Sequence, residues 1–204
     1  MEKNDLEERL ELLLALKRII GEKIPELNDR FKEQIDLRMS LNKESDRGAV
    51  LLSVAYLENY LENALKSKLI GSQKHLKKLF EFNGALGTFS SKIDMSLSIG
   101  IINDKVYSDL NTLRKIRNKF AHHFELIDLA SSNVEASILN LKLCPRRTHV
   151  KSSPRQIFIS TIFFLIGLLQ GITVKKEKIT LDATFNLLDK NLEKLRNSPP
   201  LTQK

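Results

Sequence analysis

The sequence contains no tryptophan, a single cysteine, eight glycines and five prolines among its 204 residues. Because Cys144 is alone, no intramolecular disulfide can form, and a reducing cytoplasm is the expected compartment. Glycine and proline interrupt helices, so their scarcity favours long helices over many short strands. The amino terminus, Met1-Glu2-Lys3-Asn4-Asp5, is charged and lacks the apolar core of a secretion signal.

The sequence also lacks the motifs of several common enzyme classes. No cluster of histidine, cysteine and carboxylate residues has metal-ligand spacing. Gly84 and Gly87 match neither a Walker loop nor a dinucleotide fingerprint, and no Gly-x-Ser-x-Gly motif occurs. We therefore expect neither a metal nor a cofactor.

The hydrophobic content of 42 % is enough for a folded core. The formal net charge is +8 and the isoelectric point is near 9.5. This excess of positive charge favours an acidic partner, which could be RNA, DNA, an acidic protein face or a membrane surface. Charge alone does not choose among these partners.

Apolar residues recur at helical spacing along most of the chain, which predicts an all-α protein with a single helical-bundle domain. We expect an N-terminal helical extension over residues 1–44, the bundle over 45–197 and a loose tail over 198–204. Ser45 or Asp46 is a suitable N-cap for a long central helix, and Asn103 or Asp104 for a later one. The predicted helices span residues 2–20, 25–41, 49–70, 90–100, 104–123, 133–141, 156–174 and 181–196.

Residues 156–174 carry no formal charge, and their length is at the border for crossing a bilayer. Polar residues such as Gln156, Thr161 and Gln170 dilute the stretch, and no second segment could accompany it. The sequence therefore predicts a buried helix of a soluble core and no membrane association.

Two basic clusters allow two interpretations. The first cluster, over residues 66–78, precedes Phe80 and Phe82, and the second is a predicted exposed loop over residues 144–155. Lysines beside aromatic residues could hold a nucleic acid backbone and stack a base. More often lysines cover a solvated face while phenylalanines turn inward, which is the interpretation we favour. The candidate nucleic-acid contacts are Lys74, Lys77, Lys78, Arg114, Arg146 and Arg147.

The stretch Leu113–His123 concentrates arginine, amide and imidazole groups more closely than any other part of the chain. Its leucine, isoleucine and phenylalanine recur at spacings of three and four, so they mark one buried face of a helix. Arg117, Asn118 and His122 are the candidate functional residues of that helix. Glu58, in the apolar helix 49–70, either forms an ion pair with an arginine of this stretch or lines the solvent edge.

Residues 45–143, about half of the chain, resemble the mannitol operon repressor family. The resemblance rests on SDRGAVLLSVAYLENYLENALKSKLI, LFEFNGALGTFSSKIDMSLSIGIINDKVYSDL and LRKIRNKFAHH, in that order. It implies an all-helical transcription regulator that acts mainly through a protein partner, without a helix-turn-helix that reads DNA.

The third of these stretches also resembles the HEPN superfamily, helical domains that often dimerise and carry Arg-x4-His. Arg117 and His122 have this spacing, and Asn118 is the polar residue commonly found after the arginine. In HEPN ribonucleases the motif implies metal-independent RNA cleavage. Imidazole can then exchange protons with the 2′-hydroxyl or the leaving oxygen, while arginine stabilises charge on the phosphoryl group.

We therefore carry three functional hypotheses from the sequence. The first is a homodimeric cytoplasmic regulator that binds a protein partner, in which Arg117, Asn118 and His122 hold a structural network. The alternative is a HEPN-type endoribonuclease of the toxin or phage-defence class, with His122 as acid and base. The third and weakest is a repressor that binds duplex DNA directly, which a steep salt dependence would reveal.

Overall fold

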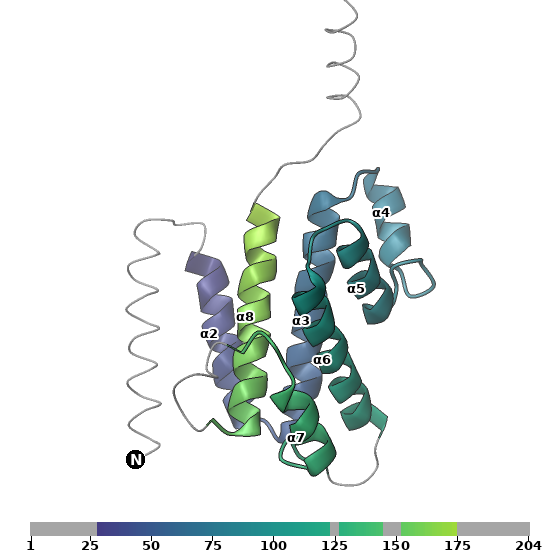
Figure 1. The fold of residues 1–204 in the computed structure, drawn as a ribbon. Helices are drawn as coiled ribbons and strands as arrows, with labels where there is room; N and C mark the ends of the chain where they lie inside the picture. Colours follow the sequence, from purple (N-terminus) through teal and green to yellow (C-terminus); the bar gives the residue numbers. More distant parts are fainter. Residues whose placement is uncertain (1–27, 123–126, 145–151, 175–204) are drawn as a thin grey trace, which may run out of the picture.

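The computed structural model describes residues 28–122, 127–144 and 152–174, and these residues form α-helices and no strand (Figure 1). The predicted all-α fold is thereby confirmed. The helices are α2 (Asn28–Lys43), α3 (Asp46–Lys68), α4 (Gln73–Phe80), α5 (Phe89–Ser98), α6 (Asp104–His122), α7 (Ser132–Leu139) and α8 (Pro154–Val174). The predicted helices 2–20 and 181–196 and the tail 198–204 lie outside the described residues.

The helix starts follow from local capping. The Ser45 hydroxyl accepts the Gly48 N–H at 3.1 Å and begins α3, as its sequence predicts. The Asn103 side chain accepts the backbone N–H groups of Lys105 and Val106 and begins α6. Such caps involve neighbours in sequence, which explains why these boundaries can be predicted without the structure.

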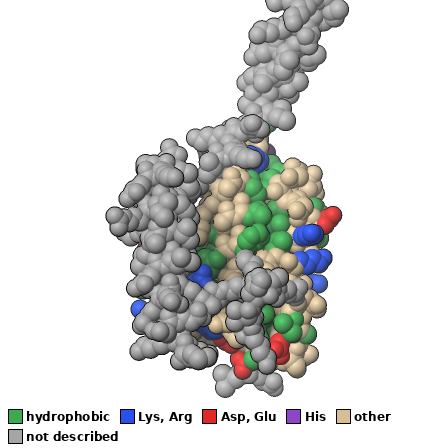
Figure 2. Space-filling model, turned by 60° about the vertical axis from the view of Figure 1, so that its left-hand side comes forward, with side chains coloured by type: hydrophobic (Ala, Val, Ile, Leu, Met, Phe, Trp, Pro, Cys, Tyr) green, Lys and Arg blue, Asp and Glu red, His purple; other side chains and the backbone are tan. Residues whose placement is uncertain are grey.

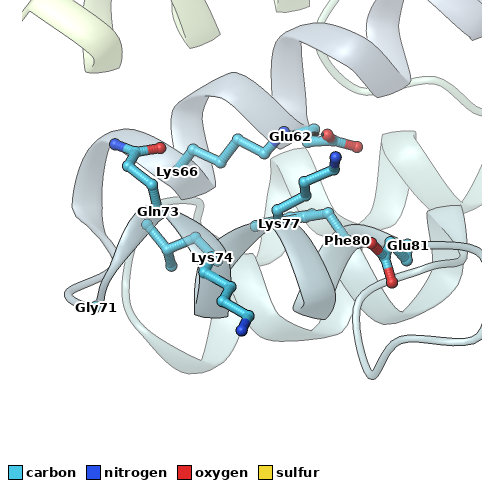
Figure 3. Close-up of a pocket in the computed structure, with 9 residues that line it drawn as sticks. Glu62, Lys66, Gly71, Gln73, Lys74, Lys77, Phe80 and Glu81 are labelled. Carbon is cyan, nitrogen blue, oxygen red and sulfur yellow. Dashed lines mark hydrogen bonds and ion pairs between the residues drawn. The ribbon is translucent and has the colours of Figure 1, made fainter.

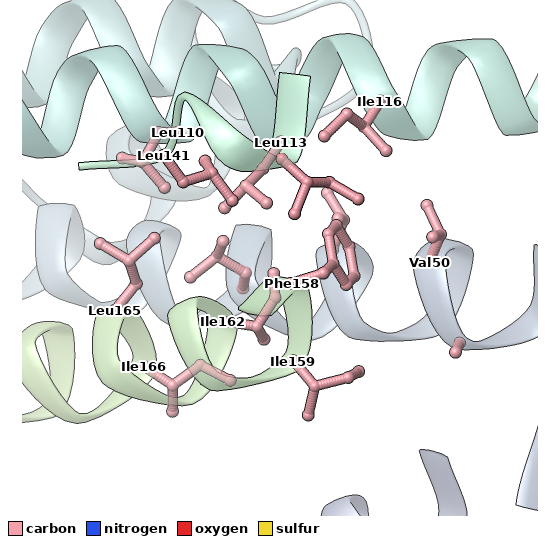
Figure 4. Close-up of a cluster of buried hydrophobic side chains, with 14 of the residues drawn as sticks. Val50, Leu110, Leu113, Ile116, Leu141, Phe158, Ile159, Ile162, Leu165 and Ile166 are labelled. Carbon is pink, nitrogen blue, oxygen red and sulfur yellow. The ribbon is translucent and has the colours of Figure 1, made fainter. Parts of the chain in front are cut away.

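The core lies between α3, α6 and α8, which run side by side through the bundle (Figures 1 and 4). One buried face of each helix meets the others there, and Phe158 of α8 lies at their centre. Fully buried members include Val54, Leu57, Leu61, Leu110, Leu113, Phe120, Phe158, Ile162 and Leu165. The apolar spacing of Leu113–His123 thus marks a core-facing side, as expected.

The helix α8 is long and apolar enough, by length and composition, to cross a membrane over Pro154–Thr173. However, 56 % of that window is buried inside the protein, which is the packing of a core helix. Its outer side leaves Phe164 exposed. Figure 2, turned so that the α2 and α8 side comes forward, shows hydrophobic side chains gathered on that face.

The helix α2 belongs to the same core, because its Leu37 and Leu41 are buried in it. The Arg155 side chain joins the end of α2 to α8: it donates to the Leu41 and Glu44 carbonyls at 2.7 and 2.8 Å and pairs with Asp46. Arg155 and the buried Cys144 therefore do not belong to an exposed basic loop, which corrects the sequence prediction. The correction follows from packing, since Pro154 starts α8 and draws Arg155 into its first turn.

Candidate functional site

A cluster of charged side chains lies where α3, α5 and α6 meet. The Lys92 ammonium of α5 lies 2.8 Å from Glu58 Oε1 and 2.8 Å from Glu62 Oε2, both on α3. Lys66 pairs with Glu62 at 2.5 Å, and Arg117 Nη2 of α6 lies 3.6 Å from Glu58 Oε2. We call these five residues the Lys92 cluster. Its cations and carboxylates alternate, so each acidic group has two positive neighbours.

The helical spacing of its residues determines where the Lys92 cluster forms. Glu58 and Glu62 are one turn apart on α3, so both carboxylates face the same neighbour. Lys92 lies on the buried face of α5, together with Phe89, Ile93 and Ser96. A capping box between Thr88 and Ser91 fixes where α5 starts, and so fixes the direction of Lys92. Only 6 % of the Lys92 side chain is exposed, against about a fifth of each glutamate.

Arg117 is held from two sides. Besides its approach to Glu58, its Nη1 donates a hydrogen bond to Asn118 Oδ1 at 3.1 Å. About a third of its side chain, 34 %, remains exposed. His122 is exposed at the last described position of α6, and in the described part of the chain no hydrogen bond joins it to Arg117. The two residues of the Arg-x4-His motif therefore share one helix and are not joined.

The ionisation of the Lys92 cluster follows from its pairing. Burial alone would raise the pKa of Glu62, but hydrogen bonds from Lys66 and Lys92 outweigh it, so the pKa falls below the ordinary 4.5. Burial alone would lower the pKa of Lys92, but hydrogen bonds to Glu58 and Glu62 outweigh it and raise this pKa above 10.5. Glu62 and Lys92 are therefore both charged at neutral pH.

These shifts predict how stability depends on pH. A carboxyl group whose pKa is lower in the folded state stabilises the fold above its unfolded value of 4.5, and this contribution disappears as the pH falls through the folded pKa. An amine whose pKa is raised on folding stabilises the fold below 10.5 and loses that contribution as the pH rises through the folded pKa. We expect the urea concentration at the midpoint of unfolding to fall at both acid and alkaline pH. In Lys92→Ala, this midpoint should fall less steeply as the pH is lowered. An equally steep acid decline in that variant would contradict the pairing.

The structure describes four of the six predicted nucleic-acid contacts. Lys74, Lys77 and Lys78 are exposed on α4, while Arg114, on α6, donates to Asn111 of the same helix at 3.4 Å. Arg146 and Arg147 lie outside the described residues. The described members thus come from two helices, α4 and α6.

The two phenylalanines after the first basic cluster behave differently. Phe80 is half-buried, with the Lys66 ammonium 4.9 Å from its ring centre. Phe82 is 90 % exposed, so the expectation that both turn inward is wrong for Phe82. The physical reason is that α4 ends before it, at Phe80, and the chain then turns sharply at Gly84.

Two buried charges were missed by sequence reasoning. Lys92 is one of them, and Asp109 of α6 is the other: its carboxylate is fully buried and accepts the backbone N–H groups of Lys142 and Leu143 at 2.8–3.0 Å. In both helices the charged residue lies three or four positions from buried residues, where an apolar residue would be expected. This spacing is the feature of the sequence from which the burial of the two charges could have been predicted.

The site offers no evident metal centre. Across the described ranges, no group of three or more histidine, cysteine or carboxylate residues could hold an ion. What the arrangement offers chemically is the partly exposed guanidinium of Arg117, in a cluster whose other charges neutralise one another. The exposed imidazole of His122 lies at the end of the same helix.

No family model matches the sequence, and no curated protein matches it either. The fold is similar to a solved structure, the MtlR–HPr complex from Escherichia coli. The superposition has a TM-score of 0.55 at 15 % sequence identity, and covers 69 % of this chain and 98 % of that chain. This likeness shows an MtlR-like helical fold.

Proposed function

We propose that this chain is a cytoplasmic, homodimeric transcription regulator that acts by binding another protein and does not read DNA directly. The observation that favours this proposal over a ribonuclease is that Arg117 already pairs with Glu58 and Asn118, which gives its guanidinium a structural role between α6 and α3. The MtlR-like fold supports the regulatory class.

HPr is the partner to test first, because the similar structure is a complex with HPr. Full-length protein titrated with HPr from the same organism should give saturable heat in isothermal titration calorimetry. The two proteins should also co-elute in gel filtration. Absence of both signals would remove HPr as the partner, and a complex with duplex DNA whose affinity depends on sequence would favour the direct repressor instead.

A metal-independent ribonuclease is the second candidate, because Arg117 keeps a third of its side chain exposed and His122 is exposed on the same helix. In this case His122 would move the proton and Arg117 would stabilise the phosphoryl charge. Purified protein is incubated with total RNA in EDTA, beside Arg117→Ala and His122→Ala variants whose folding is checked by circular dichroism. Intact RNA in every lane is the result our first proposal expects, and cleavage by the wild type alone would replace it.

A further inference from the structure

A hollow of about 710 Å³ lies between the C-terminal half of α3 and the helix α4 (Figure 3). Figure 3 shows Glu62 and Lys66 on the α3 side and Lys74 and Lys77 on the α4 side. We call this hollow the α3–α4 groove. The residues that line it are Glu62, Lys66, Gly71, Gln73, Lys74, Leu76, Lys77, Phe80 and Glu81.

Two lysines on the α4 side of the groove have no ion-pair partner among the described residues. Lys66 is already occupied, because it pairs with Glu62 and lies over the Phe80 ring. Lys74 and Lys77 are exposed, and no carboxylate within the described residues pairs with either of them. Since like charges on one helix face repel each other, an acidic ligand would relieve an unfavourable arrangement as well as gain attraction.

An exposed aromatic side chain lies immediately beyond the groove. Phe82 is 90 % exposed and follows Glu81, a lining residue. Its loop is tightly built: the Gly84 N–H donates to the Glu81 carbonyl at 2.7 Å, and a Cβ at Gly84 would lie 2.4 Å from the Leu79 carbonyl oxygen. The loop therefore holds Phe82 outward by its own backbone contacts. Aromatic residues, phenylalanine among them, are enriched in the cores of protein interfaces.

We propose that the α3–α4 groove and Phe82 dock an acidic segment of a protein partner, with an apolar side chain of that segment packed on Phe82. This deepens the proposed function and rests on it, since it names the surface that a partner would use. RNA fits the groove less well, because Glu62 and Glu81 also line it. The regularly spaced phosphates of RNA would be repelled by these carboxylates, whereas a peptide can alternate its acidic side chains with backbone N–H donors that suit Glu81.

To test this, a library of displayed random short peptides is selected for binding to the full-length protein. The best binder is then synthesised, and its affinity for the protein is measured by fluorescence polarisation. We expect selected peptides rich in aspartate and glutamate with an aromatic or aliphatic residue. The double variant Lys74→Glu/Lys77→Glu and the single variant Phe82→Ser should each weaken the peptide by about tenfold or more. A single-stranded RNA oligonucleotide is titrated in parallel.

Matched controls carry the same changes elsewhere on the surface. Lys105→Glu/Lys115→Glu reverses two exposed lysines, and Leu139→Ser removes an exposed apolar side chain. These variants should bind the peptide as the wild type does. Selected peptides that bind the groove variants equally well would overturn the groove while leaving a protein partner in place. No enriched peptide, or RNA binding lost in the lysine variant, would overturn the groove as a protein site, and the HPr titration decides the proposed function separately.

Discussion

Replacing Lys92 with alanine will lower the free energy of unfolding by about 3 kcal/mol, the lower end of the range for a broken buried ion pair. The loss is large because the ammonium, only 6 % exposed, lies between Glu58 and Glu62 and holds α5 to α3. It stays at the lower end because each carboxylate keeps another cation and a fifth of its surface in water. Urea denaturation followed by circular dichroism measures the change.

Two controls separate charge from packing. Lys105→Ala removes an exposed lysine and should change the free energy of unfolding by less than about 0.5 kcal/mol. The triple variant Glu58→Gln/Glu62→Gln/Lys92→Met removes the three central charges while keeping similar side-chain volumes, and leaves Lys66 and Arg117 partly exposed to water. It should recover part of the loss. If Lys92→Ala costs no more than Lys105→Ala, the cluster does not hold α5 to α3.

Local sequence patterns were enough to predict most of the helices. Ser45 and Asn103 bond to backbone groups only a few residues away, so the starts of α3 and α6 need no knowledge of the rest of the chain. The buried side of α6 also followed from the spacing of its apolar residues. Such patterns predict the structure correctly because they depend only on residues within one helix.

The candidate site could be predicted only in part, because its charges meet across three helices. Glu58 was expected near Arg117 or at the solvent edge, and it lies 3.6 Å from Arg117 while contacting Lys92 more closely. In the sequence, a lysine within α5 suggests a surface position unless its spacing from the buried residues of that helix is counted. Its partners Glu58 and Glu62 are also 30 or more positions away in sequence. The exposure of Phe82 was not predicted, because an apolar residue is expected to be buried, whereas a tight loop holds this one in water.

Replacing Asp109 with alanine will destabilise the protein by about 3 kcal/mol, because two partly buried backbone N–H groups lose an acceptor whose own side chain is fully buried. The Asp109 carboxylate accepts the Lys142 N–H with both oxygens and the Leu143 N–H with one, and none of its side chain is exposed. Each unsatisfied buried donor costs about 1–3 kcal/mol, and bonds to a charged acceptor lie toward the upper end.

The conservative variant and hydrogen exchange locate this effect. Asp109→Asn keeps one carbonyl acceptor, so it should lose about half as much stability as the alanine variant. The exposed Asp36→Ala should lose less than about 0.5 kcal/mol. In Asp109→Asn, the amide protons of Lys142 and Leu143 should exchange faster while those in the centre of α3 keep their protection, because the damage begins in the loop. Equal loss of protection in α3 would mean that this carboxylate supports the whole core, since the loop and the three central helices would then open as one unit.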